Sequence, residues 1–445
     1  MKTKKLISIK IIITLLLLWT LTVTGQSFDP AALAMTGNYS AISRGVSAMT
    51  WNPANLALER NKSLEFNFLS ISGQIYNNSF SISDYNRYFT EEGHHGVWSD
   101  GDKHDMLDLI PGDGLKLTTD IAINLLGVAY KNYGFSVQLV NQAGITTIKD
   151  KTPFDIVLFG PNLTRDYQYH DNIIESGEAY SALKMSFGYA YSLESDDYLP
   201  FLEDMAIGVN LNYFLGLHVA QNIESEVGLR RIPGEDDESA EYVINIENRY
   251  ANVEFSSFPG GHGLSFDLGA TAKYEDDWRF SLSLINLFGF IRWTTDVETQ
   301  KLIVADSALS WDVITSEESD NKIDYDTTHA SEAFVTSLPI TLRLGASYNL
   351  LDNLTLTADY AQALNTSFGN RYRPRIGVGA QYYPIPWLPL RGGLSLGGKE
   401  GFMFGIGTGL TFENFDFDLS YAMNNGMWPT HSEGMFTALG FKFKF

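Results

Sequence analysis

The sequence predicts an all-β protein, a transmembrane antiparallel β-barrel of about fourteen strands, and three observations support this prediction. From about residue 120 onward, apolar and polar residues alternate in segments separated by Gly, Asn and Asp. The apolar side of these segments often finishes on Tyr, as an aromatic girdle at a membrane interface would. The chain ends in LGFKFKF, a strand pattern with aromatic residues on one face.

The amino end carries the pattern of a signal peptide, which we place at residues 1–25. Four lysines precede an apolar stretch at 11–19, and Val23 and Gly25 have the small-residue spacing of a signal-peptidase cleavage site. We therefore expect an exported chain that begins at Gln26, with a retained membrane anchor as the alternative. The chain has no Cys, so no disulfide can stabilise the exported protein.

Composition narrows the class of protein. Without the signal lysines the chain has 27 Lys and Arg against 53 Asp and Glu, a net charge of −26, which argues against nucleic acid as a partner. No Pro- or Ser-rich linker divides the chain, and no later apolar run approaches the length of about 20 residues that a membrane helix needs. One closed structure at residues 62–445 fits better than several soluble domains.

The alternating segments have one apolar face and one polar face. In 414–423, Phe and Leu alternate with Asp and Ser, and segments 265–274, 339–348 and 354–360 repeat the pattern. A soluble sandwich would also alternate, but Gly, Ser, Thr and isolated charges suit a barrel lumen. The candidate lumen-lining residues are Asp267, Lys273, Arg343, Asp359, Asp416 and Asp418. The alternative is that these charges simply pair with one another.

The last strand predicts where the protein resides. Phe441, Phe443 and Phe445 share a face, which resembles the carboxy-terminal signal that the barrel assembly machinery reads in bacterial outer-membrane proteins. An unpaired edge strand of this kind would favour aggregation, whereas pairing with the first strand of a closed barrel removes the edge. We expect an outer-membrane location, lipid contact, and long outward loops at 293–338 and 230–242, where alternation is weak and charge is high.

The segment before the first strand, FDPAALAMTGNYSAISRGVSAMTWNPANLAL, is rich in small residues. It resembles the amino-terminal segment of the FadL/TodX family of outer-membrane proteins, which has an Asn-Pro-Ala step at the same place. The resemblance implies that residues 26–61 form a hatch, or plug, inside a fourteen-stranded barrel that takes up small, mostly hydrophobic molecules. The hatch residues it implies are Gly37, Asn38, Arg44, Trp51, Asn52, Pro53 and Ala54.

Two insertions depart from the uptake branch of this family. The first, near residues 84–118, predicts a helix at 102–110 that is capped near Ser99 or Asp100. The second, near residues 150–178, has a helical pattern at 151–162. Both are similar to the PorV-like branch, which implies the alternative function: binding or shuttling a secreted protein partner, without transport or catalysis.

Residues for catalysis or metal binding do not assemble into a known pattern. Asp100, Asp102 and Asp105 lack the spacing and closing Glu of a calcium loop, so helix capping explains them better. The pair His94 and His95 has no further ligand at a suitable spacing. The eight His are scattered along the chain, so the sequence does not indicate a Ser or His nucleophile–base set. The sequence predicts no enzyme, no metal and no cofactor.

Overall fold

The computed structural model describes most of the chain, and the statements below concern the described residues. The described ranges are 29–60, 62–94, 98–112, 114–147, 174–193, 201–231, 240–252, 258–309, 322–369 and 372–445, with 151, 154, 158–159 and 170–171. The expected signal peptide at 1–25 and all but a few residues of the expected helix at 151–162 lie outside these ranges.

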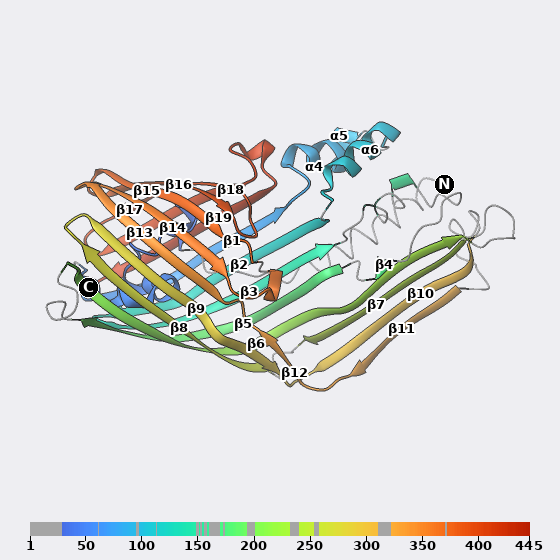
Figure 1. Cartoon of the computed structure of the whole chain (residues 1–445), viewed down its shortest axis with the longest axis horizontal. Helices are drawn as coiled ribbons and strands as arrows, with labels where there is room; N and C mark the ends of the chain where they lie inside the picture. The colour runs from blue at the N-terminus through green and yellow to red at the C-terminus, as the bar shows by residue number, and fades with distance from the viewer. Residues whose placement is uncertain are drawn as a thin grey trace.

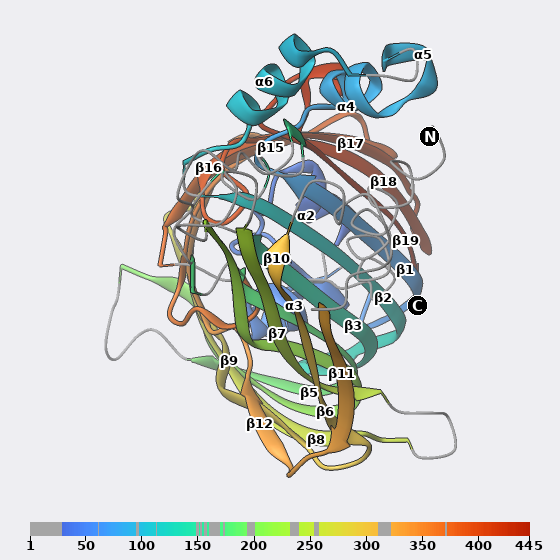
Figure 2. The ribbon, with the colours of Figure 1, turned by 90° about the vertical axis from the view of Figure 1, so that its right-hand side faces the viewer.

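Fourteen antiparallel strands form a closed barrel, which confirms the predicted fold class (Figures 1 and 2). The ring closes where the last strand pairs with the first, with Phe66 opposite Phe443. In order around the ring, the strands are β1 (Leu64–Asn77), β2 (Leu115–Tyr130), β3 (Tyr133–Thr147), β5 (Ile174–Leu193), β6 (Glu203–Arg231), β8 (Gly261–Tyr274), β9 (Trp278–Trp293), β13 (Thr341–Leu351), β14 (Leu354–Ala363), β15 (Arg375–Ile385), β16 (Leu388–Gly397), β17 (Met403–Thr411), β18 (Phe415–Asn424) and β19 (Gly434–Lys444).

The wall is apolar outside and polar inside. On β8, Leu268 is 42% exposed while its neighbour Asp267 is 1% exposed. On β18, Leu419 is 48% exposed and Asp418 is 5% exposed. Because successive side chains of a strand point to opposite faces, this alternation places leucine on the outer wall and carboxylates in the lumen. Such polarity suits a barrel surrounded by lipid.

The two ends of the barrel differ in their connections. At one end, which we call the turn end, short hairpins join neighbouring strands, as at Lys131–Asn132 between β2 and β3 and at Asp352–Asn353 between β13 and β14. At the other, which we call the loop end, longer connections carry helices and further strands.

Three helices in the β1–β2 connection lie at the loop end: α4 (Ile82–Phe89), α5 (Glu91–His94) and α6 (Asp100–Leu109) (Figure 1). Helix α6 confirms the predicted helix and its Ser99 cap, and a capping box joins Ser99 to Asp102. Helix α4 begins with an equivalent box between Ser81 and Asp84, which we did not anticipate. Among the described residues, no helix is both long and apolar enough to cross a membrane.

Replacing Ser99 with Ala should loosen α6 alone. The hydroxyl oxygen of Ser99 accepts the Asp102 amide at 3.2 Å, and losing such a cap destabilises a helix by about 1 kcal/mol. We expect amide exchange in α6 to accelerate about fivefold. The internal control is α4, which keeps its own Ser81 box. Equal acceleration in both helices, or none in α6, would contradict this assignment.

A sheet extends from the barrel wall beyond the loop end, where the sequence led us to expect loops. The second half of β6 pairs with β7 (Ala240–Asn252), β7 with β10 (Val297–Leu309), and β10 with β11 (Lys322–Ala330) (Figure 1). Two short strands, β4 (His170–Asp171) and β12 (Phe334–Ser337), pair with β6 and β9.

The prediction of loops was therefore wrong for most described residues of 293–338 and for 230–231 and 240–242. The physical reason is that this sheet lies outside the closed ring, so its strands do not separate a lipid-facing side from a polar lumen. Charged residues occupy neighbouring strands, as in the pair of Lys301 and Glu247 at 3.5 Å. Backbone pairing forms the strands, while the side chains lack the period-two apolar pattern that marks the barrel wall.

The chain before β1 lies inside the ring (Figure 2). We call residues 29–58 the inner segment. It consists of short helical turns, α2 (Pro30–Ala34), η2 (Gly45–Ser47), α3 (Ala48–Trp51) and η3 (Pro53–Ala57). Prolines begin α2 and η3. The first residue of a helix has no partner within the helix for its amide hydrogen, so proline loses no hydrogen bond there. Most of its side chains are buried, because the barrel wall surrounds the segment.

Candidate functional site

Glycines of the wall allow the inner segment to approach the strand backbones. A Cβ atom added at Gly208 on β6 would lie 2.3 Å from the Ala54 amide nitrogen. One added at Gly393 on β16 would lie 2.5 Å from the Met35 carbonyl carbon. Only glycine fits such close contact between two backbones. Wall and inner segment therefore match each other in shape on opposite sides of the lumen.

The Asn52-Pro53-Ala54 step anchors the inner segment to β8. The Asn52 side chain accepts the Ala54 amide at 3.0 Å and donates to the Ala270 carbonyl at 2.9 Å. Pro53 begins η3, and Asn52 and Ala54 are fully buried. One asparagine thus caps its own turn and binds the wall at the same time.

Trp51 and Arg343 join the inner segment to β13. The Arg343 guanidinium lies 4.4 Å from the centre of the Trp51 ring and donates to the Thr50 carbonyl at 3.1 Å. Both side chains are buried, so the cation–π contact is shielded from water. A candidate hatch residue and a candidate lumen residue therefore meet directly.

Gly37 and Asn38 occupy a tight turn that contacts three further strands. Gly37 has a φ of +79°, which favours glycine, and its carbonyl accepts a hydrogen bond from Arg375 at 3.2 Å. The side-chain amide of Asn38 donates to the backbone carbonyls of Val378 and Leu394 at 3.1 and 3.3 Å. The backbone carbonyl of Asn38 accepts a hydrogen bond from the Thr357 hydroxyl at 2.8 Å.

The candidate lumen carboxylates have different environments. Asp359 accepts the Ser40 amide of the inner segment at 3.0 Å. Asp267 instead accepts bonds from Asn210 and Asn212 of the wall at 3.0 and 2.9 Å. Lys273 does not reach the middle of the lumen. It pairs with Glu203 and Asp276 at the turn end.

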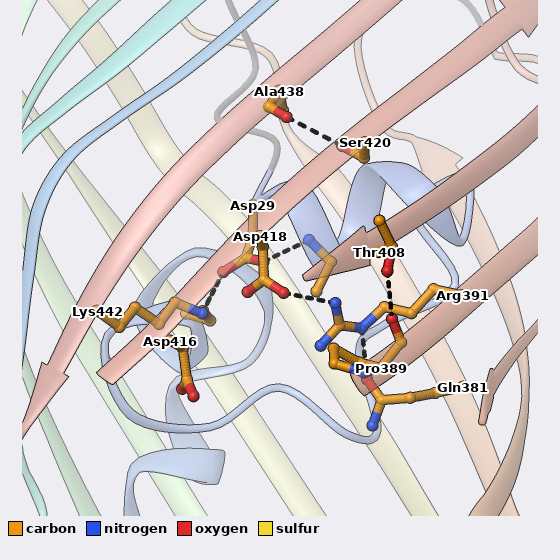
Figure 3. A network of polar contacts seen from close by, with 12 residues as sticks. Asp29, Gln381, Pro389, Arg391, Thr408, Asp416, Asp418, Ser420, Ala438 and Lys442 are labelled. Carbon is orange, nitrogen blue, oxygen red and sulfur yellow. Dashed lines mark hydrogen bonds and ion pairs between the residues drawn. The ribbon is translucent and has the colours of Figure 1, made fainter. Parts of the chain in front are cut away.

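Asp418 and Asp416 belong to a network near the turn end (Figure 3). Asp418 pairs with Arg391 at 2.6 Å, and Arg391 also donates to Gln381 at 2.7 Å. Asp416 pairs with Lys444 at 2.8 Å and is more exposed than Asp418.

Lys442, which we did not select from the sequence, links the last strand to the inner segment. Its ammonium lies 2.8 Å from a carboxylate oxygen of Asp29 and 2.8 Å from the Ser47 hydroxyl (Figure 3). The alternation of LGFKFKF could have identified it, because Lys442 lies between Phe441 and Phe443 and must face the other side. Arg44, a predicted hatch residue, has a different environment and donates to the Ser43 carbonyl.

The three terminal aromatic residues lie on the outer wall. Phe441 packs against Phe417 with ring centres 5.1 Å apart, and Phe443 packs against Phe415 at 5.3 Å. Phe445, which is 61% exposed, meets Phe66 of β1 at 5.9 Å. This placement is compatible with a signal read from outside the barrel.

An apolar cluster occupies the interior nearer the loop end. Phe368, in the turn η5 (Ser367–Gly369) of the β14–β15 connection, packs against Tyr180 with ring centres 4.5 Å apart. Its amide donates to Glu178 at 2.6 Å, and Gln142 donates to its carbonyl at 3.2 Å. No local pattern in the sequence indicates this inward turn, because its contacts join residues far apart in the chain. Val140, Phe214, Ile291, Trp293 and Leu338 complete much of the cluster.

Between this cluster and the inner segment lies Lys184. Along β5, Gly188 touches the inner segment near Leu56, Lys184 follows, and Tyr180 belongs to the apolar cluster. The Lys184 ammonium lies 5.9 Å from the centre of the Phe214 ring.

In the described part of the chain, no group of three or more His, Asp or Glu residues is placed to hold a metal ion.

A closed antiparallel barrel of fourteen strands, apolar outside and filled by its amino-terminal segment, is the fold of the FadL/TodX outer-membrane channels. The chain belongs to the family described as a family of unknown function, DUF5723, whose model matches residues 53–420. No curated protein matches the chain.

Solved structures show the same fold at low sequence identity. The Pseudomonas putida toluene transporter TodX is 13% identical, with a TM-score of 0.51 over 94% of this chain and 99% of TodX. A Pseudomonas aeruginosa FadL homologue is 10% identical, with a TM-score of 0.50 over 95% of this chain and 100% of the homologue. These likenesses define the fold.

Proposed function

We propose that the chain is an outer-membrane channel for the uptake of small, mostly hydrophobic molecules through a plugged β-barrel. The observation that supports this most is the arrangement of the lumen. A buried apolar cluster around Phe368 lies toward the loop end, and the inner segment lies toward the turn end (Figure 1). The solved structure of TodX, which shares the fold, is that of a toluene transporter.

The proposed route follows from the two ends. In outer-membrane barrels the long loops face outward and the short turns face the periplasm, which places the loop end outside the cell. An apolar molecule would enter past the Phe368 cluster and then meet the inner segment. The inner segment contacts the wall through hydrogen bonds, such as that of Asn52 to Ala270, and through the packing of small residues, such as Ala54. The segment can shift without breaking the strand pairing of the wall.

Replacing Asn52 with Ala tests this function. Two hydrogen bonds would be lost, which destabilises the seated segment by about 1–3 kcal/mol and raises the open population about tenfold. Uptake of a fluorescent apolar probe into proteoliposomes should rise while the barrel stays folded, as heat-modifiable gel migration would show. The control is Asn414→Ala, in an exposed turn. Equal uptake in wild type and Asn52→Ala would count against the proposal.

A second function, binding of a secreted protein partner, is favoured by the sheet of β7, β10 and β11 beyond the loop end. This sheet and helices α4 to α6 lie outside the lumen, at the loop end (Figure 1). Deleting residues 232–239 should then abolish cross-linking to an exported protein and leave uptake of the apolar probe unchanged. If wild type and deletion variant give the same cross-linked products, this second function is wrong.

A further inference from the structure

A pocket of about 300 Å³ lies at the turn end, between the inner segment and the wall. The inner segment contributes Ile42 and Arg44, and the hairpin of β8 and β9 contributes Lys273 and Arg279. Neutral hydrogen-bonding groups come from β13 to β15, among them Gln381. Two acidic residues of the β8–β9 hairpin, Asp276 and Asp277, also line the pocket. None of these residues takes part in the proposed passage of an apolar molecule through the apolar cluster.

The cations of this pocket are more buried than the acidic residues that pair with them. The side chains of Arg279 and Lys273 are 14% and 22% exposed. Their acidic partners lie out in water, with Asp276 at 95% and Asp204 at 63% side-chain exposure. Ion pairs with exposed partners are screened by solvent and stabilise little. The buried ends of the cations therefore keep most of their capacity to bind an anion.

Two guanidinium groups here lack strong partners. Among the described residues, Arg279 Nη1 is buried without a hydrogen-bond partner, and Nη2 reaches Asp204 only at 3.4 Å. Within the same part of the chain, Arg44 donates to the Ser43 carbonyl and forms no ion pair. Arg44 and Arg279 line the same pocket, so two like charges lie near each other there. An unpaired buried donor beside a second cation in one pocket is a feature of an anion site.

We propose that this pocket binds a phosphate group, supplied either by inorganic phosphate or by the headgroup of a phospholipid. Guanidinium groups bind phosphate oxygens through paired N–H donors, and the ammonium of Lys273 lies on the same pocket wall. The phosphate bridges Arg44 of the inner segment to Arg279 of the wall. It thereby holds the turn-end part of the inner segment in place.

The test is phosphate binding to the full-length protein in lipid-free detergent micelles, measured by isothermal titration calorimetry. One arm titrates inorganic phosphate and the other a short-chain phosphatidylglycerol, so the two sources are distinguished. Binding in either arm, weakened about tenfold in both Arg279→Gln and Arg44→Gln, supports the site. The matched control is Lys62→Gln, which removes one positive charge from an exposed ion pair with Glu413 at the same end.

The site is overturned if wild type binds neither ligand up to about 10 mM, or if Lys62→Gln weakens binding as much as the arginine variants do. Heat-modifiable migration verifies that each variant is folded. Should Arg279→Gln fail to fold, Arg44→Gln decides the result, because Arg44 lies outside the strand ladder. The experiment measures binding and not uptake. A negative result therefore contradicts the phosphate site without contradicting the proposed channel, and a negative uptake experiment leaves the phosphate site untouched.

Discussion

Replacing Gly393 with Ala is expected to displace the inner segment and open the barrel. The added Cβ would lie 2.5 to 2.6 Å from three backbone atoms of Met35. Backbone atoms cannot turn away as a flexible side chain can, so the segment itself must move. Overpacking of this kind destabilises by about 1–3 kcal/mol, enough to shift a seated segment toward a released one. We expect a clear rise in ion conductance across planar bilayers and faster proteolysis within residues 29–58.

The neighbouring glycine provides the control for this experiment. A Cβ at Gly392 would meet only the Gly405 carbonyl oxygen, at 3.7 Å, which is an ordinary contact. Gly392→Ala makes the same chemical change one residue away, on the outer face of the same strand. Equal conductance of the two variants would show that the Met35 contact does not hold the lumen closed.

Replacing Lys442 with Met should release the amino end of the inner segment. Asp29 and Lys442 form a pair in which both side chains are at most 10% exposed (Figure 3). Removing one partner of a buried ion pair typically costs about 3–5 kcal/mol, because the other charge remains buried and uncompensated. Proteolysis at the start of the inner segment should therefore accelerate more than in a variant that breaks an exposed ion pair, such as Lys62→Met.

Two further variants separate this effect from a general loss of charge. Lys62→Met breaks the exposed pair with Glu413, which we expect to contribute less than about 1 kcal/mol. The double variant Asp29→Asn with Lys442→Met removes both charges and should recover part of the stability. If Lys442→Met and Lys62→Met are equally protected from protease, the Asp29–Lys442 pair does not anchor the segment.

The barrel could be predicted from the sequence because its physical rule is local. A strand with lipid on one side and a polar lumen on the other repeats every two residues, as at Asp267 and Leu268. The same rule places Lys442 inside, although we selected only its aromatic neighbours. The hydrogen bond from the Ala54 amide to Asn52 agrees with the turn chemistry of an Asn-Pro step.

Other parts depend on contacts that no local pattern records. The inward turn at Phe368 is stabilised by Glu178 and Gln142, which are some two hundred residues away in sequence. The sheet of β7, β10 and β11 lies outside the closed ring, so its strands lack the alternation that identified the wall. Lys273 follows the alternation yet lies at the turn end, because period alone does not tell how far along the barrel axis a residue sits.

The central claim is that the inner segment must move for an apolar molecule to pass. Ser40 and Gly345 offer a direct test, because a Cβ at Gly345 would lie 2.9 Å from the Ser40 Cβ, and a small relaxation reaches the disulfide range of about 3.5–4.5 Å. The chain has no Cys, so Ser40→Cys with Gly345→Cys gives one defined tether. The measurement is probe uptake into proteoliposomes before and after reduction, with each single variant as control. Uptake that is low when oxidised and restored on reduction is the expected result, and equal uptake in both states would contradict the claim.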